Sequence, residues 1–308
     1  MPKVSVCVPV YNVEQYIGRC IESIQRQSLE DIEIVVINDC SPDKSMDIVR
    51  KYAESDVRIK IVEHDKNHGP MVARRSSYMA ATGDYITFCD SDDTLADGAL
   101  ERLYNAAVET MADIVSGVIE YIPTNDARYR WTNKLLYGTD KLSVFKSLLK
   151  DEFGHNLCSR LFRRELLQNY PYETFEKATN GEDGTLFYQV VGNACKIVAI
   201  DDVVYEYYQN LASSSNVRLT ERALRSVSIL NSIRVQTAGQ YPELQKLVTK
   251  KVSRVLFELR ISGYRIDNVV SEQNLSYYFK TSTFLKCQGL REFLTMWLKL
   301  FFYRMRKV

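Results

Sequence analysis

Several features that mark common classes of protein are missing from this chain of 308 residues. It contains no run of about 18 apolar residues, so we expect no helix that spans a membrane. The apolar run at its start is too short for a signal peptide and leads into a helical pattern, which favours a cytoplasmic location. A formal net charge of only +1 gives no basic field, so we expect no nucleic-acid partner.

Metal and nucleotide motifs are also scarce. The seven cysteines include no C-x-x-C pair, and His64, His68 and His155 lack the spacing of zinc ligands. Cysteines scattered in this way are typical of reduced thiols in the cytosol and argue against a disulfide framework. No G-x-G-x-x-G follows the first apolar run, and no G-K-[ST] loop occurs, so the sequence lacks a dinucleotide fingerprint and a phosphate loop.

The chain does contain enough apolar side chains for a sizeable core, with 45% hydrophobic and 11% aromatic residues. In its first part, runs typical of buried strands alternate with amphipathic helical patterns. This alternation predicts an α/β fold with a doubly wound, mostly parallel sheet and helices on both faces. The predicted strands are Lys3–Val10, Ile32–Ile37, Ile59–Glu63, Tyr85–Cys89 and Asp113–Tyr121. The predicted helices are Glu14–Gln27 with Asn12 as cap, one opened by Ser41 or Asp43 and ending at Glu54, Met71–Ala81, and Leu95–Met111 with Asp97 as cap.

Polar residues follow three of these predicted strands. Tyr11 follows the first strand, Asp39 follows the second, and the acidic run Asp90–Asp93 follows the fourth. The carboxyl ends of parallel strands meet at one edge of a sheet, where such folds bind ligands. Three carboxylates within four residues repel one another unless a cation lies among them, which favours a metal–diphosphate site. The alternative is an acidic turn that starts a helix.

The second half of the chain is less regular. The segment N-G-E-D puts Glu182 and Asp183 in the first turn of a predicted helix, where acids are also favourable for the helix dipole alone. Two short strands are predicted at Cys195–Ile200 and Val203–Tyr208. Two amphipathic helices, Leu219–Ala238 and Leu244–Ser262, then follow. We therefore expect one domain over residues 1–215 and a helical region over 216–308, divided near the three serines 213–215.

The last stretch, Lys286–Val308, is basic and rich in aromatic residues. One interpretation is a helix that lies on the inner face of the cell membrane over anionic lipid. The other is a helix that packs on the rest of the chain or on a second copy in a homodimer. The amphipathic pattern favours neither, because it does not distinguish buried protein from buried lipid.

Five motifs in series resemble those of the family 2 glycosyltransferases, which have the GT-A fold. They are V-S-V-C-V-P-V-Y-N, I-N-D-C-S-P-D, N-H-G-P-M-V-A-R-R, T-F-C-D-S-D-D and N-G-E-D, and the resemblance covers about residues 3–215. It implies inverting transfer of a sugar from a nucleoside-diphosphate sugar, with UDP favoured, and a divalent metal, Mn²⁺ or Mg²⁺. The implied acceptor is a glycan or a lipid-linked saccharide in surface polysaccharide synthesis.

The resemblance also implies roles for individual residues. Asp183 resembles the catalytic base, and Glu182 beside it would raise the pKa of that base. The implied metal ligands are Asp92 and Asp93. The implied nucleotide-binding residues are Pro9, Val10, Tyr11, Asp39, Arg74 and Asp90.

Departures from the family pattern narrow the expected function. The Q-x-x-R-W motif of processive synthases is missing, which favours a single addition over polymerisation. Asn38 and Cys40 stand where many members carry Asp and Gly, and Arg160 stands where relatives often carry a lysine. One alternative function is a non-catalytic sugar-nucleotide or glycan-binding subunit with a degenerate transferase fold. Another is a sugar nucleotidyltransferase, although its glycine-rich opening loop is missing.

Overall fold

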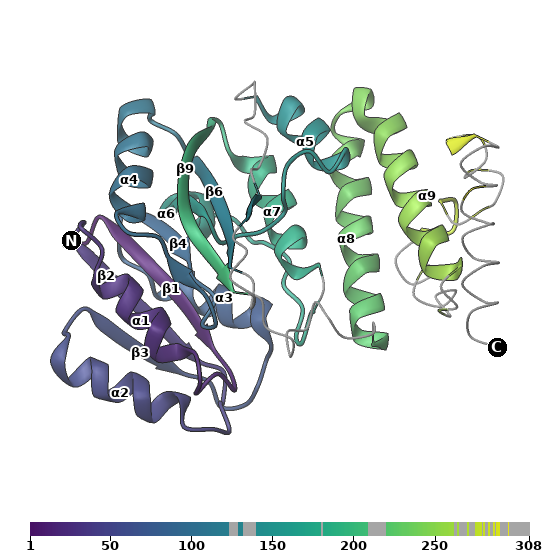
Figure 1. Ribbon diagram of the computed structural model, residues 1–308. Coiled ribbons are helices and arrows are strands. Elements are labelled where there is room, and N and C mark those ends of the chain that lie inside the picture. Colours follow the sequence, from purple (N-terminus) through teal and green to yellow (C-terminus); the bar gives the residue numbers. More distant parts are fainter. Residues whose placement is uncertain are drawn as a thin grey trace.

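The computed structural model describes residues 1–122, 129–131, 140–179, 181–208 and 220–261, with scattered positions up to residue 295. Within these residues the strands form one nine-stranded sheet in the order β3-β2-β1-β4-β8-β6-β9-β5, and β7 pairs with β6 (Figure 1). Neighbours from β3 to β4 are parallel, whereas β8 is antiparallel to both β4 and β6. The strands are β1 (Val4–Val10), β2 (Ile32–Asn38), β3 (Ile59–Glu63), β4 (Tyr85–Phe88), β5 (Thr94–Leu95), β6 (Ile114–Ile122), β7 (Tyr129–Trp131), β8 (Arg160–Arg163) and β9 (Ile197–Tyr208).

Helices cover both faces of this sheet, as the alternation of the sequence predicts. In β1, Val6 and Val8 contribute to one hydrophobic core and Cys7 contributes to the other, because successive strand side chains point to opposite faces. The first core includes α1 (Ile17–Gln25), α2 (Ser45–Ser55) and α4 (Ala99–Thr110). The second includes α3 (Pro70–Ala80), α5 (Lys141–Leu149), α6 (Arg164–Gln168) and α7 (Glu182–Asn193).

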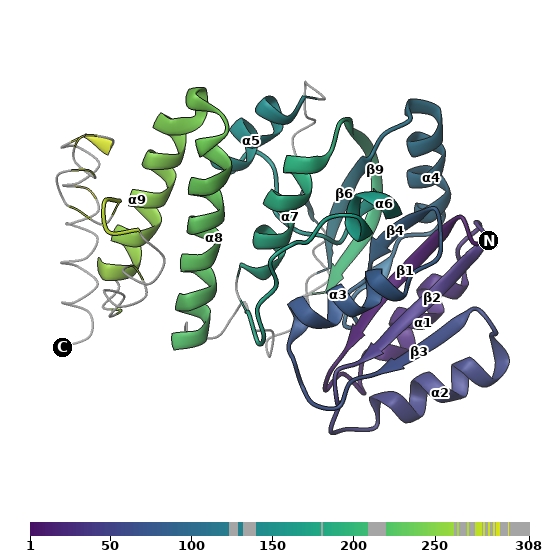
Figure 2. The ribbon, with the colours of Figure 1, turned by 180° about the vertical axis from the view of Figure 1, so that it is seen from behind.

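Two further helices extend this second core away from the sheet. Helix α8 (Glu221–Gly239) packs on α7, and α9 (Gln245–Ile261) packs on α8 after a short 3-10 turn, η2 (Pro242–Leu244) (Figure 2). Leu230 and Ile233 of α8 belong to the same core as the side chains of α7. The predicted boundary at 213–215 lies outside the described residues. So does most of Lys286–Val308, and its membrane or dimer contact stays a prediction.

Helices α1 and α4 do not begin at the residues predicted as their N-caps. The backbone of Asn12 has a positive φ of 57°, its N–H donates to Ser41 Oγ at 2.8 Å, and α1 begins only at Ile17. The prediction of Asn12 as a cap is therefore wrong, because the loop after β1 is hydrogen-bonded to the loop after β2. Asp97 is not a cap either. Leu95, where we expected a helix, pairs instead with β9, and Gly98 precedes α4.

The two short strands predicted around Asp201 form the single strand β9. Its pairing with β6 shifts register around Val118: from Ser116 to Val118 β6 advances two positions, while β9 advances four, from Ala199 to Val203. A bulge of this kind absorbs polar residues without ending the strand. Among the described residues, none of the helices is long and apolar enough to cross a membrane.

Glu33 provides a first testable prediction, because it is a buried carboxylate that joins β1, β2 and the turn before β4. It accepts hydrogen bonds from Ser5 Oγ (2.6 Å) and Thr82 N (2.6 Å) and is paired with Lys60. Burial alone would raise its pKa, but the hydrogen bonds from Lys60, Ser5 and Thr82 prevail and lower the pKa to about 2. The ionised form is therefore stabilised by folding.

We expect Glu33→Gln to reduce the free energy of unfolding by about 3 kcal/mol at pH 7, as the pKa shift implies. Because the folded pKa lies below the ordinary value, this contribution is complete above about pH 4.5 and disappears as the pH falls toward 2. Urea unfolding of the wild type and the variant at pH 7 and pH 3 measures the difference. An equal loss of stability at both pH values would contradict the assignment.

Candidate functional site

The carboxyl ends of β1, β2 and β4 open into a cleft of about 1370 Å³, whose other walls come from α3, α7 and the start of α8. All of the site residues predicted from the sequence line this one cleft. They are Pro9, Val10, Tyr11, Asp39, Arg74, Asp90, Asp92, Asp93, Glu182 and Asp183. The convergence of the residues after β1, β2 and β4 is what the parallel topology predicts, since these strand ends meet at one edge. Arg74 and the two acids of α7 reach the cleft from helices.

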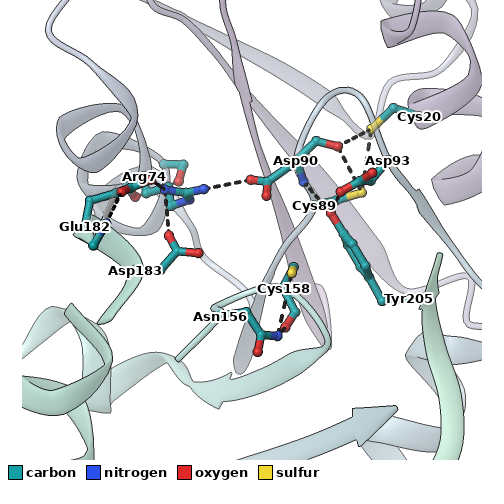
Figure 3. Close-up of polar contacts among 12 residues, drawn as sticks. Cys20, Arg74, Cys89, Asp90, Asp93, Asn156, Cys158, Glu182, Asp183 and Tyr205 are labelled. Carbon is teal, nitrogen blue, oxygen red and sulfur yellow. Dashed lines mark hydrogen bonds and ion pairs between the residues drawn. The ribbon is translucent and has the colours of Figure 1, made fainter. Parts of the chain in front are cut away.

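Arg74 lies at the centre of the charged residues (Figure 3). Its guanidinium is buried, with 7% of the side chain exposed, and its Nη2 donates to Asp90 Oδ1 at 2.8 Å. Its Nη1 lies 2.8 Å from Asp183 Oδ1 and 3.6 Å from Glu182 Oε1. These carboxylates keep the pKa of Arg74 well above its usual value despite burial. Arg74 therefore joins the acid after β4 to the acids that begin α7.

Among the acids that contact Arg74, Asp183 has a clearly raised pKa. Burial, followed by the negative charges of Glu182 and Asp90, raises its pKa to about 7 against the opposing effect of Arg74. The approach of Arg74 to Asp183 Oδ1 is an ion pair without hydrogen-bond alignment. Within the described residues, this oxygen therefore has no hydrogen bond. The side chain as a whole is still 26% exposed to the cleft. A partly exposed carboxylate with a pKa near neutrality is suited to accept a proton.

Asp39 fixes the loop after β3. Its carboxylate accepts hydrogen bonds from the backbone N–H groups of His68 and Gly69, both at 2.8 Å, and lies 2.7 Å from Nδ1 of His64. Gly69 has a φ of 92°, and a Cβ there would meet Lys177 Cα at 2.6 Å, so only glycine fits. The sequence predicted Asp39 as a ligand of the nucleobase, and the structure adds a role in shaping the cleft wall.

Asp93 differs from the other acids of its loop. It is 1% exposed, and its two oxygens accept hydrogen bonds from Tyr205 Oη and Tyr208 N, both at 2.8 Å. Burial and the neighbouring charges of Asp92 and Asp90 raise its pKa to about 8. Tyr205 Oη in turn accepts a hydrogen bond from Asp90 N at 3.2 Å. Asp93 therefore fastens its loop to β9 through both carboxylate oxygens, and its implied metal ligation stays a prediction.

Two residues that hold the loop after β4 in place, Arg19 and Tyr205, belong to none of the sequence motifs. Arg19 of α1 donates to the backbone oxygen of Asp92 at 2.6 Å, and its guanidinium lies 3.6 Å from the centre of the Tyr208 ring. Tyr205, which lies within the predicted strand Val203–Tyr208, is fully buried and also bonds the loop. Neither residue belongs to a local motif, because each reaches the loop from a distant part of the chain.

Arg160, whose role the sequence left open, lies beneath the cleft and not in it. Its side chain is fully buried, donates to Gly154 O at 2.7 Å and stacks on the rings of Phe153 and Phe187. Burial lowers its pKa to about 9. This arrangement is that of a core arginine that supports α7.

Comparison with known proteins agrees with the fold and with the motifs. A family model for glycosyl transferase family 2 matches residues 5–170. EpsJ, an uncharacterized glycosyltransferase of Bacillus subtilis (strain 168), is 33% identical over 222 residues, which cover 70% of this chain and 64% of EpsJ. The match thus spans less than two thirds of that relative.

Solved structures share the fold at low sequence identity. Residues 1–349 of S. aureus TarS, in complex with UDP, align with a TM-score of 0.64 and 20% identity, covering 88% of this chain and 75% of that one. The mannosyltransferase PcManGT from Pyrobaculum calidifontis, in complex with GDP-Man and Mn²⁺, aligns with a TM-score of 0.53 and 16% identity over 97% of this chain and 87% of its own. The predicted GT-A type fold is confirmed. Since the family model spans more than half of the 308 residues, the chain belongs to glycosyl transferase family 2.

Proposed function

We propose that this protein is an inverting, non-processive glycosyltransferase. It moves a sugar from a nucleoside-diphosphate donor, with UDP as the nucleotide, to a hydroxyl of a glycan or lipid-linked saccharide in surface polysaccharide synthesis. The observation that carries the proposal is Asp183. This carboxylate has a pKa raised to about 7 and is 26% exposed, in one cleft with the acidic loop after β4.

Asp183 acts as the general base in this proposal. Its partly exposed carboxylate accepts the proton of the acceptor hydroxyl as the hydroxyl oxygen attacks the sugar carbon, and a pKa near the working pH suits such a transfer. The bond from the sugar to the diphosphate breaks in the same displacement, so the configuration inverts. Glu182 acts on Asp183 through its charge, because its own carboxylate accepts a hydrogen bond from Gly181 N at 3.0 Å.

The walls near β1 and β2 hold the nucleotide. Tyr11 is 47% exposed at the end of β1 and offers a ring for stacking, with Pro9 and Val10 beside it. Asp39 retains one acceptor site for a base N–H, because a carboxylate has about four such sites and three are occupied. Asp90 lies between this wall and Arg74, where a ribose would reach it.

The residues present fit a divalent cation whose other ligands are phosphate oxygens. Among the described residues, no group of three or more acidic, histidine or cysteine side chains forms a complete metal site. Asp92 is the proposed ligand from the acidic loop. Mg²⁺ and Mn²⁺ commonly bind one or two carboxylates together with substrate phosphates, and the metal then neutralises charge on the leaving diphosphate. A cleft this acidic would otherwise repel a diphosphate.

A donor screen tests the proposal. The protein is incubated with UDP-, GDP- and dTDP-sugars and Mn²⁺ or Mg²⁺, and release of the nucleoside diphosphate is followed. We expect release from one donor, lost with EDTA and in Asp92→Ala. Calorimetry with UDP on the same samples distinguishes the transferase from a non-catalytic subunit. Such a subunit would bind UDP but would release no product when acceptors are supplied. Release of pyrophosphate from a nucleoside triphosphate and a sugar phosphate would instead indicate a nucleotidyltransferase.

A further inference from the structure

Arg19 contacts the acidic loop after β4 without lining the cleft itself. It lies on α1, and its side chain is half-buried. Its Nη2 donates to the backbone oxygen of Asp92 at 2.6 Å. Asp92 lines the cleft, whereas Arg19 is not among the described residues around it. Any influence of Arg19 on a ligand in the cleft therefore passes through Asp92.

The loop that carries Asp92 is a tight turn over residues 90–93. Asp93 N donates to Asp90 O at 3.0 Å and closes the turn, with Asp92 at its third position. Tyr205 Oη of β9 holds both ends, because it donates to Asp93 Oδ2 and accepts a hydrogen bond from Asp90 N (Figure 3). These bonds hold the ends of the turn, and the bond from Arg19 holds its centre at Asp92.

The guanidinium of Arg19 is itself held by aromatic rings. Its Cζ lies 3.6 Å from the centre of the Tyr208 ring and 6.0 Å from the centre of the Tyr16 ring. A planar guanidinium is attracted to the face of an aromatic ring. Its Nε is buried and has no hydrogen bond within the described part of the chain. The bond to Asp92 thus comes from a side chain whose direction is fixed by packing, as support of a functional residue requires.

We infer that Arg19 is a positioning residue for the divalent cation proposed at Asp92. The inference rests on the proposed function, in which Asp92 binds the cation together with the diphosphate. Groups that orient a metal ligand affect metal affinity by about ten- to a hundredfold. By holding the backbone of Asp92, Arg19 determines where the carboxylate points before the cation and the nucleotide bind.

The charge of Arg19 acts in the opposite direction. A guanidinium near a cation repels it, so charge alone predicts that removal of Arg19 strengthens metal binding. Positioning predicts that the same change weakens metal binding. Lysine separates the two contributions, because it keeps the charge and donates hydrogen bonds but lacks the planar group that stacks on a ring.

Metal-dependent binding of UDP tests the inference without the natural donor or acceptor. UDP is titrated by calorimetry into the protein at a series of Mn²⁺ concentrations, which gives the concentration at half of the metal's full effect on UDP affinity. We expect this concentration to rise about tenfold in Arg19→Met and by less in Arg19→Lys. Tyr208→Leu removes the stacked ring but keeps the bond from Tyr208 N to Asp93, so we expect a rise of about threefold.

Arg26 provides the matched control on the same helix. It follows α1 directly, its side chain is 59% exposed, and it does not line the cleft. Arg26→Met should therefore leave the Mn²⁺ requirement unchanged. Uridine lacks the diphosphate, so its affinity should be the same in all four variants and shows that each is folded.

Three results would overturn the inference. An unchanged Mn²⁺ requirement in Arg19→Met would show that Arg19 does not position Asp92, and a lower requirement would show that its charge prevails. A loss of uridine binding in Arg19→Met, together with an unchanged Mn²⁺ requirement in Tyr208→Leu, would assign Arg19 to the fold alone. A wild type that binds UDP equally well with and without Mn²⁺ would instead count against the metal site of the proposed function.

Discussion

Replacing Asp183 by asparagine is expected to lower kcat for sugar transfer by about a thousandfold, within the range that general bases contribute. The amide has nearly the shape of the carboxylate but does not accept the proton of the acceptor hydroxyl. The affinity for UDP should change little, because Asp183 is placed at the acceptor side of the sugar. Steady-state rates with the donor identified in the screen, together with UDP calorimetry, give both quantities. A loss of UDP affinity comparable to the loss of rate would contradict a role as base.

The pH dependence gives an independent test of the same residue. A base acts only when ionised, and the pKa of Asp183 is raised to about 7. We therefore expect kcat/KM to fall about tenfold for each pH unit below this value and to level off above it. In Asp183→Asn this dependence should disappear. A wild-type rate that is constant between pH 5.5 and 7.5 would show that the group is not titrating in the reaction.

Glu182 provides the control for this pair of acids. It neighbours Asp183, yet its carboxylate is bonded to Gly181 N and lies 3.6 Å from Arg74. Glu182→Gln removes one charge that raises the pKa of Asp183. We expect the pH profile to shift to lower pH, with a maximal rate within about tenfold of the wild type. A loss of rate in Glu182→Gln as large as that in Asp183→Asn would instead indicate that Glu182 is the base.

The sequence predicted the position of this cleft well because its signals are local. Three of the motifs lie at the ends of β1, β2 and β4, and parallel strands bring those ends to one edge. The other two put Arg74 in α3 and Asp183 at the start of α7. Tyr11, Asp39, Asp90 and Asp183 line one cleft, although long stretches of sequence separate them. The same reasoning predicted the alternating layers, because apolar periodicity reports which face of an element is buried.

What the sequence did not predict depends on contacts between distant segments. Leu95 has a helical pattern, but pairing with β9 overrides it, and Gly98 rather than Asp97 precedes the helix. Asp93 is indistinguishable from Asp92 in sequence. The hydrogen bonds that Asp93 accepts from Tyr205 and Tyr208 come from 112 and 115 residues away. Tertiary pairing of this kind leaves no local pattern, so it became visible only in the folded chain.

Arg74 has contacts that the sequence did not indicate, and its implied contact with the donor stays a prediction. The resemblance implied that it holds the donor, but its guanidinium is buried among the carboxylates of Asp90, Asp183 and Glu182. It therefore neutralises acids that burial has brought together. Removing one partner of such a group leaves uncompensated charge, which usually costs more than the pair contributes when intact.

We expect Arg74→Met to reduce the free energy of unfolding at pH 8 by about 3 kcal/mol, the lower end for a broken buried pair because the carboxylates are partly exposed. Without Arg74, burial and mutual repulsion raise the pKa of Asp183 further. A carboxyl with a raised folded pKa binds its proton more tightly in the folded state, so the variant regains stability as the pH falls from 8 toward its unfolded pKa near 4.

Urea unfolding at pH 8 and pH 5.5 measures both effects, with Arg75→Met as the control because Arg75 is the exposed neighbour of Arg74 in α3. The loss of unfolding free energy in Arg74→Met should be clearly smaller at pH 5.5 than at pH 8. Arg75→Met should change the free energy of unfolding little at either pH. If Arg74→Met retains activity, the acid limb of its pH–rate profile should move to higher pH. A loss of stability that is independent of pH would instead indicate that Arg74 acts by packing, and the acids at this edge would then be held apart by other contacts.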